Sequence, residues 1–338
     1  MIKKFFLKPT KTFIIAEIGS NHNQSLAKAK KLIKLSAKNG ADAVKFQYLN
    51  FKDMYTDDKR FKKEKEIFKK VCFPESWIPK LNKYSKKLNI IFFFSITSFS
   101  CLKLAIKYKI PILKIASPQF FSNPWLIEAC LRTGKKVILS TGLSSFKEIK
   151  KRIESLKNKK LTKNSCLLYC DSRYPLEIEN FDYKQISLYK QKFNLPVGLS
   201  DHTLSTMVPA ISVFEGAEVI EKHITLNRKD NGPDHFFSLE INEFSEMVKN
   251  IREVEKIIFT KKFKKKSLNN KYRKLYQIKC IADKDYKIND KLNGIKKSGL
   301  RSVNGINIEM AEKLENNYTV KKNIKKDDII NFSKLKKR

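Results

Sequence analysis

The sequence predicts an α/β fold: a closed (β/α)8 TIM barrel of parallel strands and surrounding helices, followed by a small C-terminal, mainly β domain. Short apolar runs alternate with longer amphipathic runs eight times between residues 12 and 257. This alternation is typical of parallel strands that helices bury on both faces, and eight units in about 250 residues match a closed barrel. An open doubly wound sheet is the alternative, but no GxGxxG motif follows the first apolar run.

The predicted strands are short runs rich in Ile, Val, Leu and Phe, which favour extended and buried backbone. They are Thr12–Ile18, Ala43–Gln47, Ile90–Ser95, Ile112–Ile115, Val137–Leu139, Cys166–Tyr169, Val197–Leu199 and Val219–Ile224. Because most positions in them are apolar, both faces of each strand are expected to be covered.

Helices are predicted between and after these strands, where apolar residues recur every three or four positions. They are Ser25–Asn39, Glu75–Leu88, Phe99–Tyr108, Asn123–Arg132, Ser145–Leu156, Phe181–Phe193, Ser205–Glu215 and Ile241–Ile257. Gly40 suits the left-handed residue that ends the first helix. The mixed charges of Tyr48–Pro74 indicate a helical insertion.

The character of the chain changes after the last predicted helix. Phe259–Lys274 contains eight Lys or Arg and no acid, which is typical of an exposed linker. We therefore divide the chain into a barrel (1–257), a basic linker (258–274) and a small, mainly β domain with short helices (275–338). The Lys-rich end FSKLKKR is expected to be a frayed tail.

The formal net charge of +37 is extreme and raises the possibility of nucleic acid as a partner. The lysines are nevertheless spread along the whole chain, with no RNA-binding aromatic signature and no zinc-finger spacing. Specific nucleic-acid binding is therefore not expected, although a basic scaffold for polyanions stays open as a non-enzymatic alternative. A positive field also favours small anionic substrates such as phosphates.

Neither membrane insertion nor export is expected. No run reaches the roughly 18 apolar residues that cross a bilayer, and charges interrupt the apolar N-terminal stretch, which lacks a small-residue cleavage site. Six scattered cysteines without a CxxC pair indicate reduced thiols in a cytoplasmic protein.

Polar residues follow every predicted strand, where the active site of such a barrel lies. In chain order they are Glu17, Lys45, Gln47, Thr97, Ser98, Lys114, Ser117, Ser140, Thr141, Ser172, Arg173, Tyr174, Ser200, Asp201, His202, Glu221, Lys222 and His223. Lys45 and Lys114 stand in otherwise apolar strands, which is unfavourable unless the ammonium group meets an anion. Together with Ser and Thr hydroxyls they predict a phosphate or carboxylate cradle; the alternative is that both lysines extend outward to solvent.

His202 and His223 end adjacent predicted strands, so their rings can converge on one divalent cation and leave positions open for water and substrate. The chain has only four histidines, all in two short polar stretches; for any single one, a helix cap or a satisfied core group is the alternative. Glu17 and Asp234 would add carboxylates for proton transfer or hydroxyl binding. Asp234 lies in an NGPDH turn, where an Asx-turn role competes.

Six motifs in order, IIAEIGSNHN, GADAVKFQ, LKIAS, ILSTG, VGLSDHT and EKHITL…GPDHFFSLE, resemble the N-acetylneuraminate (sialic acid) synthase family, which includes pseudaminic and legionaminic acid synthases. The resemblance covers about residues 12–257 in register. It is weaker over 275–338, where that family carries an antifreeze-like (SAF) domain.

The resemblance implies condensation of phosphoenolpyruvate with an N-acylated mannosamine-type sugar, with release of phosphate by C–O cleavage. It implies Mn²⁺ or Mg²⁺ and a homodimer in which each SAF domain covers the partner's site. His202 and His223 match the metal ligands, and Glu17 and Asp234 match catalytic positions that meet the sugar. The positions that match substrate-binding residues are Lys45, Gln47, Thr97, Lys114, Ser117, Ser140, Ser172, Tyr174 and Ser200.

Departures from the family pattern fall mostly on the sugar side. The family's NHNG motif ends in Gln24 here instead of glycine, and its KFQT motif ends in Tyr48 instead of threonine. The family's CTS or CTN after the sixth strand reads Cys170-Asp171-Ser172. In the SAF domain either Lys297 or Arg301 supplies the cation that reaches the neighbouring site, and Arg301 is preferred because a guanidinium binds in a bidentate manner.

The sugar and the reaction class each leave an alternative open. The sugar is either an N-acylmannosamine or the 2,4-diacetamido sugar of a pseudaminic or legionaminic acid synthase. A related phosphoenolpyruvate condensation, or a Schiff-base aldolase using Lys114, is the second enzymatic alternative.

Overall fold

The computed structural model describes residues 11–56, 58–259, 270–296 and 299–338. The chain forms two compact units, Met1–Thr260 and Lys261–Arg338. Among the described residues, no helix combines the length and the apolar character that crossing a membrane requires.

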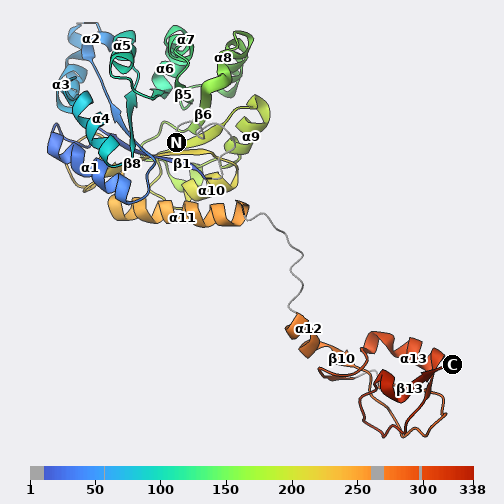
Figure 1. Ribbon diagram of the computed structural model, residues 1–338. Helices are drawn as coiled ribbons and strands as arrows, with labels where there is room; N and C mark the ends of the chain where they lie inside the picture. The colour runs from blue at the N-terminus through green and yellow to red at the C-terminus, as the bar shows by residue number, and fades with distance from the viewer. Residues whose placement is uncertain (1–10, 57, 260–269, 297–298) are drawn as a thin grey trace. The chain divides into compact units, whose positions relative to one another are not determined.

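The first unit is a closed barrel of eight parallel strands, which confirms the predicted fold class (Figure 1). The strands are β1 Phe13–Gly19, β2 Ala43–Gln47, β3 Ile91–Ser95, β4 Ile112–Ile115, β5 Lys136–Ser140, β6 Ser165–Cys170, β7 Val197–Asp201 and β8 Val219–Thr225. Each strand pairs with the next, and β1 pairs with both β2 and β8, which closes the barrel. A short strand, β9 (Leu239–Glu240), adds to the end of β8.

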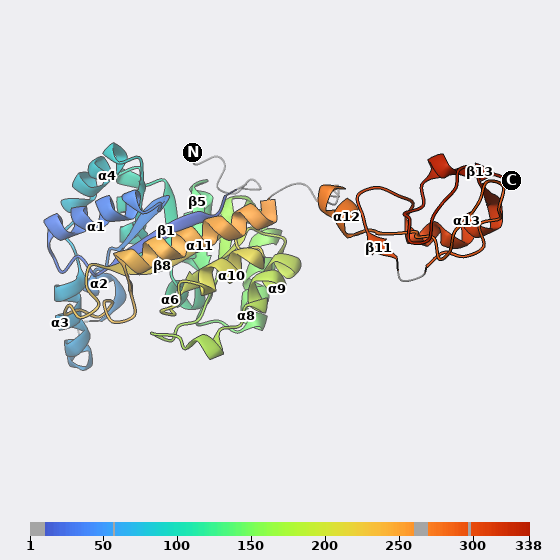
Figure 2. The same cartoon turned by 90° about the horizontal axis from the view of Figure 1, so that it is seen from below.

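Helices surround the strands. They are α1 Leu26–Lys38, α4 Trp77–Lys87, α5 Phe99–Lys107, α6 Ser117–Ser122, α7 Pro124–Arg132, α8 Phe146–Asn158, α9 Lys184–Phe193, α10 Val208–Phe214 and α11 Ile241–Phe259, with single 3-10 turns η3 (Thr162–Asn164) and η4 (Ile178–Asn180). Figure 2 shows α10 and α11 side by side, and the two helices pack against each other. All eight predicted helices are present, and α6, directly after β4, was not predicted.

Local sequence explains where several helices begin. Ser25 caps α1 by accepting a hydrogen bond from Lys28 N, and Ser145 and Glu148 form a capping box at α8. The predicted helical insertion between β2 and α4 consists of α2 (Phe51–Met54), the turn η2 (Lys59–Phe61) and α3 (Lys62–Val71).

The core lies both inside the barrel and between the strands and helices. All seven residues of β8 are buried, and so are the consecutive Phe92, Phe93 and Phe94 of β3. Since successive side chains of a strand point to opposite faces, both faces of these strands are covered. This explains why the strands read as nearly continuous apolar runs.

The second unit is small and is built from short strands around its own core. Its elements are α12 Asn270–Tyr276, β10 Ile278–Lys279, β11 Leu300–Arg301, η5 Ile308–Met310, α13 Ala311–Asn317, β12 Tyr318–Val320, η6 Phe332–Lys334 and β13 Leu335–Lys337. β10 pairs with β11, and β12 pairs with β13, both antiparallel. Side chains such as Cys280, Leu292, Leu314 and Ile330 are fully buried at its centre.

One expectation about the C-terminal part needs correction. The end of the chain is not frayed, because β13 pairs with β12 and Leu335 is buried. The predicted linker 258–274 is helical at both margins, since α11 reaches Phe259 and α12 begins at Asn270. Residues 260–269 lie outside the described part of the chain.

Gly198 of β7 is required by the barrel geometry. A Cβ atom there would lie 2.2 Å from the carbonyl oxygen of Val219 and 2.7 Å from Cδ2 of Leu168. We expect Gly198→Ala to lower the free energy of unfolding by at least about 2 kcal/mol, since a paired backbone carbonyl cannot move aside. Urea unfolding followed by circular dichroism measures this; an unchanged midpoint would contradict such close packing of β7 on β8.

Candidate active site at the carboxyl ends of the strands

A cavity of about 390 Å³ lies at the carboxyl ends of the barrel strands. Seven of the eight strands contribute to it, directly or through the residues that follow them. Eleven of the fourteen residues that the sequence singled out line this cavity: Lys45, Gln47, Thr97, Lys114, Ser117, Ser140, Ser172, Tyr174, Ser200, His202 and His223. The structure therefore brings together residues that are up to 178 positions apart, between Lys45 and His223; their individual roles stay predictions.

Two buried lysines of the cavity are paired with two buried glutamates. Lys45 Nζ lies 2.9 Å from Glu17 Oε2 and 3.7 Å from Glu221 Oε2. Lys114 Nζ lies 3.3 Å from Glu221 Oε1, which also accepts a hydrogen bond of 2.9 Å from Ser200 Oγ. Glu221 thus stands between both ammonium groups, and neither lysine extends to solvent.

The two lysines and the two glutamates shift one another's pKa values. Burial lowers the pKa of Lys114 against the opposing effect of Glu221, whereas Glu17 and Glu221 hold the pKa of Lys45 above its ordinary value despite its burial. Burial alone would raise the pKa of Glu221, but Lys114 and Lys45 together hold it below its ordinary value. Burial raises the pKa of Glu17 to about 7, against the opposing effect of Lys45. Near neutral pH the cluster therefore holds two ammonium groups, one firmly ionised carboxylate and one carboxyl that is close to half protonated.

Several polar atoms beside the cluster have no partner within the described protein. Ser140 Oγ and His223 Nδ1 are buried and make no hydrogen bond there. Buried polar groups without partners are unfavourable by about 1–3 kcal/mol each. Because both residues line the cavity, a bound ligand is the natural partner, and the excess positive charge favours an anionic one.

His202 and His223 lie together at the ends of the adjacent strands β7 and β8, with ring centroids 5.8 Å apart. The His202 ring is fixed, because its Nδ1 bonds to the carbonyl oxygen of Asp171 and Tyr174 packs on it with ring centroids 4.0 Å apart. A carbonyl only accepts hydrogen bonds, so Nδ1 carries the proton and Nε2 has its lone pair free.

Both rings are suited to binding a metal. Burial lowers the pKa of His202 to about 4 and that of His223 well below its usual range, so both are neutral at pH 7, as ligation requires. Within the described ranges, no three His, Cys, Asp or Glu side chains gather as a metal-binding group. The chain thus offers two nitrogen ligands, and other positions would be left to water or substrate.

Asp234 joins two loops beside the cavity but is not among the residues that line it. Its carboxylate accepts hydrogen bonds from Ser20 N (2.9 Å) and Ser20 Oγ (2.8 Å). The approach is close: Gly19 has φ +53°, and a Cβ there would lie 2.5 Å from Asp234 Oδ2. The contacts of Asp234 are with the loop after β1 rather than with the Asx turn that was the alternative.

The other two histidines have structural partners. His235 bridges Thr225 Oγ1 (2.7 Å) and Asn23 Oδ1 (2.9 Å). His22 is buried among Phe46, Phe73 and Trp77, and its Nδ1 accepts a hydrogen bond from Gln24 N. The four histidines therefore do not form one site.

The last candidate, Arg301, belongs to the second unit. It lies on β11, exposed, with its guanidinium carbon 4.9 Å from the centroid of the Tyr276 ring. Lys297, its alternative, lies outside the described residues.

Some residues of the cavity are not predicted from the sequence. Glu221 stands at the end of a predicted strand with no role assigned to it, although it contacts both lysines. The signal was available, because Glu221 and His223 are two positions apart on one strand and so share a face. Cys170 and Ser95 also line the cavity, as do Leu49 and Met54 of the insertion; the insertion gave no periodic signal that could place its side chains.

Known proteins are similar to this chain in sequence and in structure. The NeuB family model matches residues 32–263. The N,N'-diacetyllegionaminic acid synthase of Campylobacter jejuni is 33% identical over 334 residues, covering 95% of this chain and 99% of that protein. The pseudaminic acid synthase of Helicobacter pylori is 34% identical over 258 residues, covering 73% and 75%. The crystal structure of N-acetylneuraminic acid synthetase from Leptospira borgpetersenii in complex with citrate aligns with a TM-score of 0.71 and 32% identity, covering 78% of this chain and 90% of that one.

The buried His22 predicts a pH effect on stability. Burial lowers its pKa from an ordinary 6.5 to about 4, so the unfolded chain binds the proton more tightly. The contribution of His22 is complete above pH 6.5 and is lost as the pH falls toward 4, by about 2 kcal/mol between pH 7.5 and pH 5. His22→Asn, which retains a hydrogen-bond acceptor, should lose that much less stability over this interval in urea titrations. Equal losses in both proteins would show that His22 titrates normally.

Proposed function

We propose that this chain, which belongs to the NeuB family, is a nonulosonic acid synthase that condenses phosphoenolpyruvate with an N-acylated mannosamine-type sugar and releases phosphate by C–O cleavage. One observation carries the proposal. Two buried ammonium groups, Lys45 and Lys114, lie in one cavity with a pair of neutral histidines and with unpartnered polar atoms. This arrangement suits a small anion beside an electrophile.

Phosphoenolpyruvate fits the lysine side of the cavity. Its phosphate and carboxylate would be held by Lys45 and Lys114, and the unpartnered Ser140 hydroxyl would donate to one of its oxygens. Ser117, Ser200 and Thr97, which line the same cavity, would complete the contacts. Fixed cations next to the substrate stabilise charge as it moves from the enol toward the departing phosphate.

The histidines define the place of the sugar. A divalent cation, Mn²⁺ or Mg²⁺, held by His202 and His223 would supply Lewis acidity toward the carbonyl oxygen of the open-chain sugar. The protein's own residues orient the two substrates, so that C3 of phosphoenolpyruvate forms a bond to the carbonyl carbon. C2 then takes up water, and its bond to the phosphate oxygen breaks.

Glu17 is well suited to handle a proton in this reaction. Burial brings its pKa to about 7, where a carboxyl both donates and accepts protons efficiently. Its contact with Lys45 and its hydrogen bond from Gln47 Nε2 (3.3 Å) fix its orientation. Asp234 would act from the neighbouring loop on a sugar hydroxyl.

The assembly and location form part of the same proposal. The second unit would be an SAF domain that covers the partner's cavity in a homodimer, with Arg301 reaching the partner's sugar. The similarity to the C. jejuni relative extends over 95% of this chain and therefore includes the second unit, so this unit belongs to the part that the two proteins share. A cytoplasmic location is supported by the six cysteines, all of which are free thiols.

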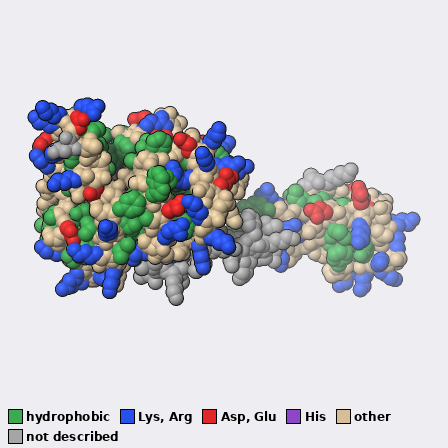
Figure 3. Space-filling view, turned by 90° about the horizontal axis from the view of Figure 1, so that it is seen from above, with side chains coloured by type: hydrophobic (Ala, Val, Ile, Leu, Met, Phe, Trp, Pro, Cys, Tyr) green, Lys and Arg blue, Asp and Glu red, His purple; other side chains and the backbone are tan. Residues whose placement is uncertain are grey.

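A second substrate class has an observation in its favour. One relative that matches nearly the whole chain is an N,N'-diacetyllegionaminic acid synthase, which favours a 2,4-diacetamido sugar. The polyanion scaffold is disfavoured, because Figure 3 shows Lys and Arg scattered over the barrel face among acidic and apolar side chains rather than gathered in one stripe. A scaffold would also have no use for buried lysines facing histidines.

A phosphate-release assay tests the proposed reaction. The full chain with Mn²⁺ and phosphoenolpyruvate is given N-acetylmannosamine, its 6-phosphate or a 2,4-diacetamido sugar, and phosphate should appear with one of these only. With ¹⁸O in the C–O–P bridge of phosphoenolpyruvate, the label should leave with phosphate. Label retained in the sugar acid would contradict C–O cleavage, and no turnover with any sugar would contradict the proposed function.

The lysine cradle can be tested by binding alone. Lys114→Met should weaken phosphoenolpyruvate binding by about 10- to 100-fold in calorimetry, since a charge-assisted hydrogen bond is lost. Lys107→Met removes a lysine paired with Glu75 on the surface and should leave binding unchanged, which controls for net charge. Equal affinities in the two variants would contradict the cradle. A borohydride-trapped adduct on Lys114 would instead support a Schiff-base aldolase.

A further inference from the structure

Another buried ion pair, outside the lysine cluster, is formed by the two residues that precede the histidines. Asp201 and Lys222 are hydrogen-bonded to each other, and their side chains are 1% and 0% exposed. They are register partners on the adjacent strands β7 and β8. Each immediately precedes one of the histidines, Asp201 before His202 and Lys222 before His223.

The alternation of strand side chains separates this pair from the cavity. Ser200 and Glu221, one position earlier on each strand, are also register partners and line the cavity. Asp201 and Lys222 therefore face away from the barrel interior. The bond between Asp201 and Lys222 holds the two strands in one register. Because side chains alternate along a strand, the neighbouring residues then point toward the barrel interior.

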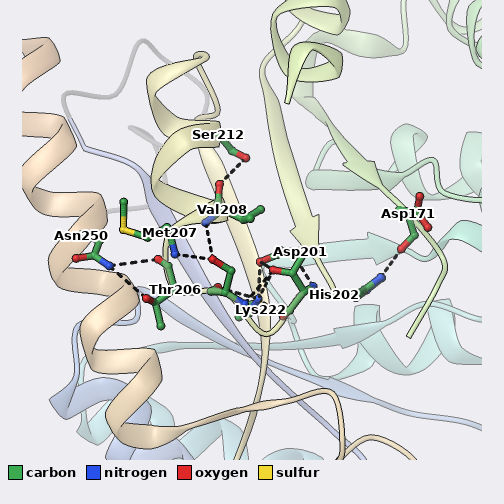
Figure 4. Close-up of polar contacts among 11 residues, drawn as sticks. Asp171, Asp201, His202, Thr206, Met207, Val208, Ser212, Lys222 and Asn250 are labelled. Carbon is green, nitrogen blue, oxygen red and sulfur yellow. Dashed lines mark hydrogen bonds and ion pairs between the residues drawn. The ribbon is translucent and has the colours of Figure 1, made fainter. Parts of the chain in front are cut away.

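The pair also shapes the loop that begins at His202 (Figure 4). The Asp201 carboxylate accepts hydrogen bonds from Thr203 N (2.9 Å) and Thr203 Oγ1 (3.1 Å). The Lys222 ammonium donates to the carbonyl oxygens of Thr203 and Ser205. The first turn after β7 is thus built around one buried ammonium group.

The same loop is tied to the helices outside the barrel. Ser205 Oγ accepts hydrogen bonds from Met207 N (3.0 Å) and Val208 N (3.2 Å) at the start of α10. Asn250 of α11 donates to Thr206, as Figure 4 shows. The backbone on which His202 stands therefore has few ways to move.

Stability alone does not explain a buried ion pair. Taking both charges out of water offsets their attraction, and replacing such a pair by apolar residues is often neutral or stabilising. No part of the cavity requires these two charges as ligands, since they face the helices. What sets this pair apart from the ion pairs described on the surface is that each member immediately precedes one of the two histidines.

We infer that Asp201 and Lys222 form a positioning pair, which holds His202 and His223 in the orientation that a divalent cation requires. The inference rests on the proposed function in one respect, that the histidines bind the metal. Residues that hydrogen-bond to metal ligands typically change metal affinity by about 10- to 100-fold when they are replaced, and we expect an effect of this order from a pair that acts through the backbone of both histidines.

Binding of Mn²⁺ alone to the full chain, measured by the electron paramagnetic resonance signal of free Mn²⁺, tests the inference. In Asp201→Asn/Lys222→Met the amide still accepts the hydrogen bond from Thr203 N, while both charges disappear. The double variant should stay folded and bind Mn²⁺ about 10- to 100-fold more weakly than the wild type. A folded double variant with unchanged affinity overturns the inference.

A control separates positioning from general destabilisation. Arg252 forms a partly buried ion pair with Glu255 (2.7 Å) and donates to the carbonyl oxygen of Thr12. Thr12 directly precedes β1, at the end of the barrel away from the cavity. Arg252→Met should lower the melting temperature and leave Mn²⁺ affinity unchanged. A comparable loss of affinity in this variant would overturn the inference.

Two further outcomes are also decisive. If the double variant does not fold, Lys222→Gln, which retains a donor for the loop carbonyls, is used; it should weaken Mn²⁺ binding, and unchanged affinity overturns the inference. If the wild type binds no Mn²⁺, the metal part of the proposed function fails, and ¹⁵N spectra of the histidine rings decide. The wild type should show His202 protonated on Nδ1 alone, and the variant should show mixed tautomers; identical spectra overturn the positioning role.

Discussion

The burial of Lys45 and Lys114 inside the barrel is the constraint on which the rest of the site depends. A buried ammonium group is strongly unfavourable unless an opposite charge meets it, and Glu221 meets both, with Glu17 beside Lys45. Two cations share the negative charge of one firmly ionised carboxylate and one partly protonated carboxyl. The cavity is therefore preorganised for an anion, and the barrel supplies the strands that hold these four side chains in register.

The two histidines of the cavity complement this charge with neutral rings. His202 and His223 stay neutral because burial and the nearby lysines disfavour further positive charge. Adjacent strands β7 and β8 thus carry different chemistry on their two faces: histidines and Glu221 inside, and the Asp201–Lys222 pair against the helices. These two strands therefore carry both the groups proposed to act on the substrate and the ion pair that packs against the helices.

The sequence predicted the barrel and most of the cavity residues because both follow from local patterns: short apolar runs for the strands, and the polar residues at the end of each run. Apolar runs marked the strands, and the carboxyl-end rule placed Lys114 or His202 without any coordinates. What it missed depends on contacts between distant segments. The contacts of Glu221 with two lysines depend on the register of the strands. Only the residues packed around them distinguish His22 and His235 from the two histidines of the cavity. Leu335 is buried because its strand pairs with Val320, fifteen residues earlier. The insertion carrying Met54 lacks a periodic pattern altogether.

The most direct measurement is a crystal structure of the full chain with phosphoenolpyruvate. The account predicts that the phosphate or carboxylate oxygens lie within hydrogen-bonding distance of Lys45 Nζ, Lys114 Nζ and Ser140 Oγ, with the reactive carbon facing His202 and His223. Phosphoenolpyruvate bound elsewhere, with the two lysines still held only by Glu17 and Glu221, would contradict it.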